Sequence, residues 1–114
     1  MEKIYIENYD KSKMKNLIVL SGRELGDNLR KNFKLNELDN NDKQYEIVFP
    51  ENIISISTSF FLAMFGESVR KYGSKEKFED KYIFNVKNNM KSNINDGIND
   101  ALNNVDGLSL WIIL

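Results

Sequence analysis

The sequence predicts a single α/β domain over residues 1–114, with a central mixed β-sheet of about five or six strands and helices mainly on one face. Two observations predict this class. Short runs of branched and aromatic residues, typical of buried strands, alternate with longer segments in which apolar residues recur every four positions. The chain is also long enough to close one hydrophobic core, and no repeat or linker divides it.

The expected strands are short segments rich in Ile, Val, Leu, Tyr and Phe, as buried strands usually are. They cover residues 4–6, 17–20, 45–49, 81–85 and 108–114. A further stretch with Ile53, Ile54 and Ile56 follows the turn at Pro50 and leads into a Ser/Thr cluster. The polar segments between these elements, residues 8–15 and 36–43, are expected to be loops or turns.

The expected helices cover residues 21–34, about 57–72 and about 90–102. In the first helix, Ser21 and Glu24 match a capping box with Ser21 as the N-cap. Gly22 and Gly26 share one side of this helix, which would let it lie close to a sheet. The second helix ends at Gly73, a typical left-handed C-terminal cap.

The composition excludes several classes of function. The chain contains neither Cys nor His, which excludes disulfides, thiolate metal sites and catalytic triads built on imidazole. No acidic spacing of a calcium loop is present, and we expect neither a metal nor a cofactor. With 16 basic and 17 acidic residues and no basic cluster, we expect no nucleic-acid partner. These absences favour a binding or regulatory module over an enzyme.

No segment is long and apolar enough for a membrane span, and no secretory signal opens the chain. We therefore expect no membrane partner and a cytoplasmic location.

The Ser/Thr cluster at residues 57–59 lies where an expected strand is followed by a helix. Free N–H groups and the positive end of the helix dipole meet there, so the position suits both a helix cap and a phosphate. In the helix that follows, Phe61 and Phe65 belong to a wide apolar face suited to packing on a sheet. Phe60 and Met64 point to another side. We expect them to form a docking surface for a partner, or else to be covered by a neighbouring loop or helix.

Several motifs carry a resemblance to a known family: Thr58-Ser59-Phe60, Phe65-Gly66, Gly73 and Phe78. With the order of the elements, they make the chain resemble the STAS superfamily, the fold of bacterial anti-sigma-factor antagonists. The chain resembles more closely the STAS-like domain family of unknown function found in bacteria and phages.

The sequence departs from both families at positions where they carry acidic residues. The antagonists have Asp where this chain has Ser57, and the STAS-like family has acidic residues where this chain has Val48, Leu62 and Ala63.

The resemblance implies a non-catalytic regulatory module that binds a protein partner. In the antagonists, an anti-sigma factor that is also an ATPase-fold kinase phosphorylates a Ser in the strand-to-helix loop, and the phosphate breaks the complex. The resemblance places the phosphoacceptor at Thr58, with Ser59 beside it. The implied partner surface consists of Ser57, Thr58, Ser59, Phe60 and Met64. Plain helix capping by these hydroxyls remains the competing interpretation.

Other interpretations remain open. The chain is alternatively a phage-type inhibitor that binds and blocks a host enzyme or defence complex, which its small size and apolar side chains would suit. A sensor for a small molecule such as a nucleotide would use a helix N-terminus as its anion site. Trp111 belongs to the expected terminal strand, where it either fills the core or anchors a homodimer through an edge strand.

Overall fold

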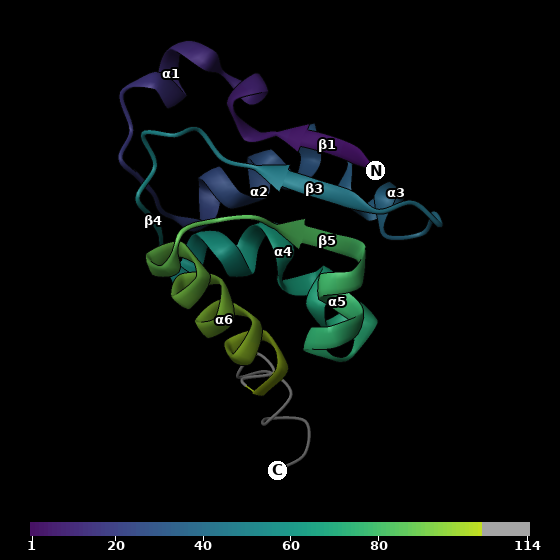
Figure 1. The fold of residues 1–114 in the computed structure, drawn as a ribbon. Helices are drawn as coiled ribbons and strands as arrows, with labels where there is room; N and C mark the ends of the chain where they lie inside the picture. The colour runs from purple at the N-terminus through teal and green to yellow at the C-terminus, as the bar shows by residue number, and fades with distance from the viewer. Residues whose placement is uncertain (104–114) are drawn as a thin grey trace.

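Short parallel strands alternate with helices in the computed structural model, which describes residues 1–103, so the predicted α/β class is confirmed (Figure 1). The strands are β1 (Glu2–Tyr5), β2 (Val19–Leu20), β3 (Tyr45–Val48), β4 (Ser55–Ile56) and β5 (Tyr82–Phe84). The helices are the 3-10 helix η1 (Ile6–Tyr9), α1 (Lys11–Lys15), α2 (Arg23–Asn32), α3 (Leu35–Leu38), α4 (Thr58–Tyr72), α5 (Lys75–Lys81) and α6 (Asn88–Asn103). The expected strand at residues 108–114, with Trp111, lies outside the described residues.

The strands form two parallel groups rather than the single mixed sheet that we predicted. β3 lies between β1 and β5 in a three-stranded sheet, and β2 pairs separately with β4. The prediction of about five or six strands in one sheet is therefore wrong for residues 1–103. The parallel direction has a simple cause: helical segments separate β1, β3 and β5 along the chain, and such crossovers join parallel strands.

One face of the three-stranded sheet is buried under helices. In β3, the side chains of Tyr45 and Ile47 are buried, whereas Glu46 and Val48 on the other face are partly exposed. The register places Ile4 of β1 beside Ile47, and Ile47 beside Phe84 of β5. α2 and α4 lie behind these strands in Figure 1.

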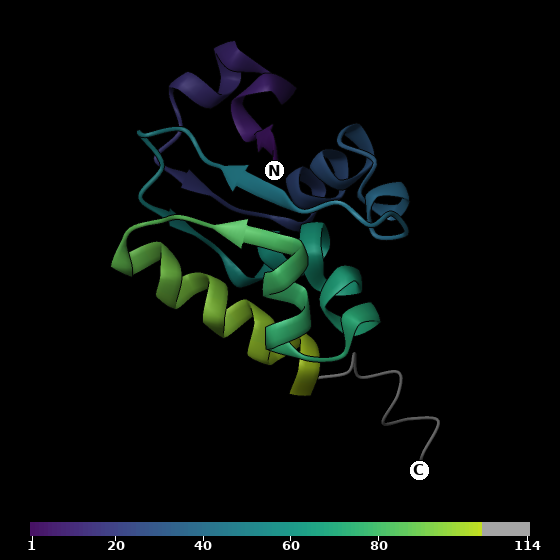
Figure 2. The ribbon, with the colours of Figure 1, turned by 45° about the vertical axis from the view of Figure 1, so that its right-hand side comes forward.

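α4 occupies the centre of the helical layer. It lies between α2 and α6 in both Figure 1 and Figure 2. Two glycines allow this close packing. A Cβ atom on Gly26 of α2 would lie 2.5 Å from the carbonyl oxygen of Phe60 and 2.7 Å from the Cβ of Ala63. A Cβ atom on Gly97 of α6 would collide with the ring of Phe61. Gly26 thus brings α2 close to a helix, whereas we expected it to approach a sheet.

The two ends of α4 agree with the sequence analysis. Ser57 is the N-cap, in an extended conformation with φ −82° and ψ 159°. Gly73 has φ 81° and ends the helix in the left-handed region, where a residue without Cβ is favoured.

The expected capping box at the start of α2 is wrong. The N-cap is Gly22, with φ 91° and no side-chain cap, and Ser21 is exposed. The helix begins at Arg23, which leaves the Ser21 hydroxyl outside the capping position.

Short helices occupy most of the first segment that we expected to be a loop and only the start of the second, whose residues 39–43 are non-helical as expected. A further short helix occupies part of the chain to which we assigned no element. η1 and α1 occupy most of residues 8–15, where the Asp10 carboxylate accepts a hydrogen bond from the Lys13 N–H at 3.0 Å. α3 lies at the start of the expected 36–43 turn, and α5 begins at the Ser74 cap. Each of α1, α3 and α5 buries a single large apolar side chain, which anchors the segment to the core. One apolar residue cannot give the repeated spacing from which a helix is predicted.

Substitution of the glycines tests the central position of α4. We expect Gly26→Ala to lower the free energy of unfolding by roughly 1–3 kcal/mol, because the new methyl group would meet rigid backbone of α4. Gly66→Ala is the matched control, since its Cβ would meet only the guanidinium end of Arg70, at 3.4 Å. This control should change stability little or raise it by up to about 1 kcal/mol. Urea unfolding of both variants measures the difference, and equal effects would contradict the packing described.

Candidate functional site

The start of α4 is held in place by the hydroxyl group of Ser57. Its Oγ accepts hydrogen bonds from the N–H groups of Phe60, at 3.1 Å, and Gly22, at 3.4 Å. The Ser57 N–H donates to the carbonyl of Leu20 at 2.9 Å. Because Gly22 is the N-cap of α2, these bonds place the first turns of α2 and α4 side by side. Of the three hydroxyl residues in the cluster, Ser57 is therefore the cap.

The other two hydroxyl residues face solvent. Thr58 and Ser59 are both exposed, and the Ser59 hydroxyl is hydrogen-bonded to that of Ser57 at 3.1 Å. No acidic residue lies in the first turn of α4, so the positive end of its dipole is not neutralised from within the helix. Arg23 is exposed in the first turn of α2. A negatively charged group attached at Thr58 or Ser59 would thus meet a favourable electrostatic environment.

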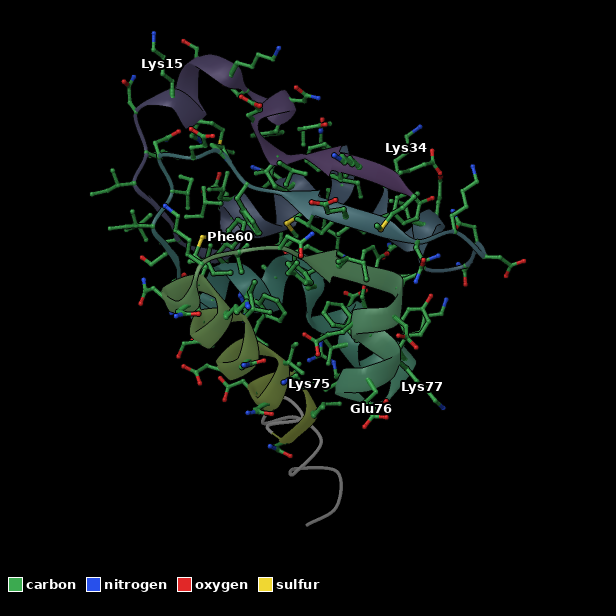
Figure 3. The ribbon with its side chains drawn as sticks, in the orientation of Figure 1. Lys15, Lys34, Phe60, Lys75, Glu76 and Lys77 are labelled. Atoms are coloured by element: carbon green, nitrogen blue, oxygen red, sulfur yellow. The ribbon has the colours of Figure 1, made fainter. Side chains whose placement is uncertain are left out.

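Phe60 and Met64 are fully buried, so the prediction that they form an exposed docking surface is wrong. α2 covers this side of α4: Gly26 packs against the backbone at Phe60, and the Met64 carbonyl accepts a hydrogen bond from Arg30 Nη1 at 2.7 Å. In Figure 3 the labelled Phe60 lies in the interior, whereas the labelled Lys15 and Lys34 extend outwards. The alternative expectation was that a neighbouring loop or helix covers Phe60 and Met64. α2 is that helix.

A buried polar network lies beside this interface and was not found from the sequence. Arg30 donates from Nη2 to the Asp39 carboxylate at 3.0 Å and from Nη1 to the hydroxyl oxygen of Ser68 at 3.0 Å. The Ser68 hydroxyl donates to Asp39, 2.7 Å from the nearer carboxylate oxygen. The Tyr82 hydroxyl donates to the other oxygen at 2.5 Å. Burial, and then the hydrogen bond to Asp39, raise the pKa of the Tyr82 phenol above its ordinary value.

This network connects α2, α3, α4 and β5. Within residues 1–103, no buried polar side-chain atom lacks a hydrogen-bond partner. Since Ser68 is fully buried and its hydroxyl is satisfied, we interpret the network as structural rather than catalytic. The sequence carried little signal for this network, because its members are spread along the chain and match no motif. They are Arg30, Asp39, Ser68 and Tyr82.

Three comparisons with known proteins gave no match: no protein-family model, curated protein or solved structure is similar to this chain. Within residues 1–103, no group of three or more acidic side chains could hold a metal ion. None of the helices in the described part of the chain is both long and apolar enough to cross a membrane.

The assignment of Ser57 as the cap leads to a stability test. Ser57→Ala removes the acceptor of the Phe60 and Gly22 N–H groups and should lower the free energy of unfolding by about 1 kcal/mol. Ser59→Ala is the matched control and should change it by less than about 0.5 kcal/mol, because Ser59 is exposed and caps no N–H group. Chemical denaturation of both variants provides the comparison. A larger loss for Ser59→Ala would show that the cap is assigned to the wrong residue.

The raised pKa of Tyr82 predicts a loss of stability in alkaline solution. An unfolded tyrosine ionises near pH 10, whereas folding keeps the Tyr82 phenol protonated. Its contribution is therefore fully present below about pH 10 and decreases as the pH rises above that value. Tyr82→Phe should be less stable at neutral pH by roughly 1–2 kcal/mol, but its stability should fall less steeply above pH 10. Urea titrations at pH 8, 10 and 11 measure both effects, and parallel pH profiles would contradict the prediction.

Proposed function

We propose that this chain is a non-catalytic regulatory module of the anti-sigma-factor-antagonist type, which binds a protein partner through the amino-terminal end of α4. Phosphorylation of Thr58 or Ser59 controls this binding. One observation carries the proposal: Ser57 alone caps the helix, which leaves the hydroxyl groups of Thr58 and Ser59 exposed to solvent. These two side chains are thus accessible to a kinase, and their modification does not require the cap to break.

A phosphate at this position would change the surface without unfolding the domain. It adds a charge of about −1.5 to −2 at neutral pH at the N-terminus of α4, whose first turn contains no acidic residue. The dipole of α4 would stabilise that charge. The first turn of the adjoining α2 carries both Arg23 and the acidic Glu24. A partner that binds the unmodified surface would then meet a new negative charge, and the complex would weaken.

The partner surface in this proposal differs in part from the one expected from the sequence. Phe60 and Met64 are excluded by their burial, and Ser57 is occupied as the cap. The surface therefore consists of Thr58 and Ser59 with the adjoining start of α2. A partner of the ATPase-fold kinase type, which is also the anti-sigma factor, is proposed from the resemblance to the antagonists.

An inhibitor function is the alternative, and a different surface favours it. Ile18, Val19 and Ile54 are 61%, 37% and 59% exposed. Val19 lies in β2, and Ile18 and Ile54 immediately precede β2 and β4, where the Ile54 N–H donates to the Ile18 carbonyl at 2.8 Å. Clustered exposed apolar side chains are typical of protein interfaces. An inhibitor would bind its target through this patch constitutively, without modification.

Copurification from the native cell, with mass spectrometry of the partner and of the peptide containing residues 55–59, distinguishes the two functions. The regulatory proposal expects phosphate at Thr58 or Ser59 on the free protein and an unmodified peptide in the complex. A Thr58→Ala/Ser59→Ala variant should remain bound to the partner under all conditions, and Ser92→Ala, on exposed α6 surface, is the matched control.

Two outcomes would contradict the regulatory proposal. One is a complex that forms and dissociates identically for the wild type and the double variant. The other combines two observations: Ile54→Asp abolishes binding of the partner, and no phosphate is found at residues 55–59. That outcome would instead support the inhibitor function.

A further inference from the structure

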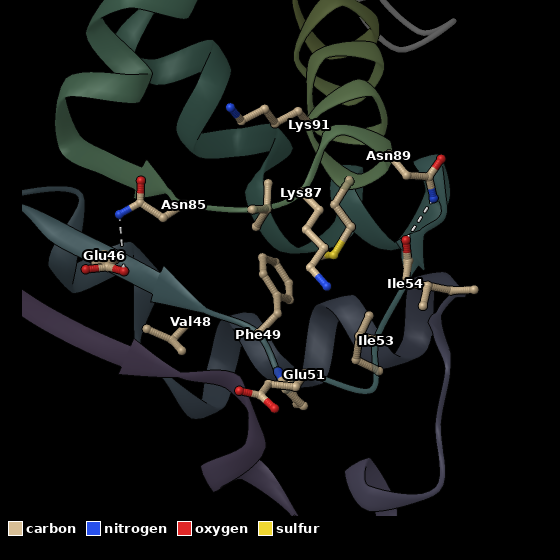
Figure 4. A pocket seen from close by; sticks show the side chains of 13 residues that line it. Glu46, Val48, Phe49, Glu51, Ile53, Ile54, Asn85, Lys87, Asn89 and Lys91 are labelled. Carbon is tan, nitrogen blue, oxygen red and sulfur yellow. Dashed lines mark hydrogen bonds between the residues drawn. The ribbon is translucent and has the colours of Figure 1, made fainter.

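A cleft opens at the carboxyl ends of β3 and β5, apart from the start of α4. Its volume is about 750 Å³, within the roughly 300–1,000 Å³ typical of small-molecule sites. One wall is the segment that follows β3, and the other is the segment that follows β5 together with the first turn of α6 (Figure 4). In open parallel sheets, ligands commonly bind outside the carboxyl ends of the strands, where the loops diverge.

The cleft has an apolar floor. Ile53 and Met90 are each only 5% exposed, and the floor continues over Val48, Phe49 and Val86, which are half-buried. The ring of Phe49 stacks on that of Phe84, with centroids 6.4 Å apart, which holds one flat surface of the cleft in place. Such a floor suits a flat apolar body, and the flexible Met90 side chain can adapt to its outline.

The cleft also has a cationic element. Lys87 lies just before α6 and points into the cleft in Figure 4, and Lys91 lies at the rim one helical turn later. Neither lysine forms an ion pair or a side-chain hydrogen bond with any residue in the range 1–103. Both stand at the positive end of the α6 dipole, and the first turn of α6 contains no acidic residue.

Two cations at the amino end of a helix, one turn apart, destabilise that helix unless an anion is near. The acidic residues that line the cleft do not neutralise them. Glu46 accepts a weak hydrogen bond from Asn85 at 3.4 Å, and Glu51 is exposed on the opposite wall.

We infer that this cleft binds a small organic anion with a flat apolar body, such as an aromatic carboxylate or sulfonate. The body rests on Phe49, Val86 and Met90, and the anionic group lies at the Lys87 ammonium and the amino end of α6. This binding places a negative charge where the helix dipole and the unpaired lysine both favour one. The site is independent of the proposed phosphorylation at the start of α4.

The probe for this site is naphthalene-2-sulfonate, with uncharged naphthalene-2-methanol for comparison. Titration of the whole protein, followed in a two-dimensional ¹H–¹⁵N NMR spectrum, should give saturable shifts confined to residues 46–54 and 85–91. The uncharged compound, and Lys87→Gln with the sulfonate, should each bind about tenfold more weakly, which is the effect of losing one charge-assisted hydrogen bond. Glu51→Gln should tighten binding, because it removes a like charge from the opposite wall.

Lys77→Gln is the matched control, since Lys77 is an exposed lysine on α5 that does not line the cleft. It should leave the dissociation constant unchanged. The inference is overturned if millimolar sulfonate gives no saturable shifts, or if the shifts lie elsewhere. It is also overturned if the charged and uncharged probes bind equally well, or if Lys87→Gln and Lys77→Gln bind the sulfonate alike. The spectrum of each free variant verifies that it is folded.

Discussion

The packing of α4 against its neighbours is the constraint on which the rest of the structure depends. On one side its Phe61 and Phe65 rings contact the aromatic residues of α5 and β5. The Phe65 centroid lies 5.3 Å from that of Phe84, 5.9 Å from Tyr82 and 6.0 Å from Phe78. On other sides, α2 and α6 approach it at Gly26 and Gly97. A helix enclosed in this way offers little apolar side-chain surface to a partner, and its exposed amino end becomes the accessible feature.

The buried polar network determines how α2 and α4 are oriented relative to each other. A hydrophobic contact alone would tolerate small shifts along the helices, whereas Arg30 has to reach Met64, Ser68 and Asp39 at once. A buried ion pair is not by itself a strong source of stability, but the loss of one partner leaves a charge unsatisfied. This fixed orientation carries the first turn of α2 to that of α4, where Gly22 meets the Ser57 hydroxyl. The arrangement of the exposed Ser/Thr site is thus a consequence of contacts in the interior.

The sequence was sufficient for the elements whose signal is local. α4 and α6 have apolar residues at helical spacing, Gly73 ends α4, and β3 and β5 are short branched and aromatic segments. The short helices were missed because α1, α3 and α5 each bury one large apolar side chain and are otherwise polar. The single-sheet prediction failed because strand pairing is a long-range property: β2 and β4 are each two residues long and, among residues 1–103, pair only with each other.

The candidate site was predictable in place but not in detail. A Ser/Thr cluster between a strand and a helix indicates a capped N-terminus, yet all three residues are of capping types. The extended backbone at Ser57 determines that it is the cap. Phe60 and Met64 are buried because α2 packs on them at Gly26. The spacing of apolar residues within α4 does not reveal that contact. The cleft beside α6 likewise requires the loops after β3 and β5 to be placed together.

Native-state hydrogen exchange of the α4 amides, followed by NMR, tests most directly the claim that neighbouring elements enclose Phe60, Phe61, Met64 and Phe65 of α4, while Thr58 and Ser59 are exposed at its amino end. We expect the amides of residues 61–72 to exchange only through global unfolding and to be among the slowest in the protein. The amide of Ser59 should exchange much faster, because it lies in the exposed first turn. Exchange of the 61–72 amides through a partial opening, at a free energy well below that of global unfolding, would contradict the enclosure of these side chains. Phe60 and Met64 would then be accessible in the native ensemble as a docking surface.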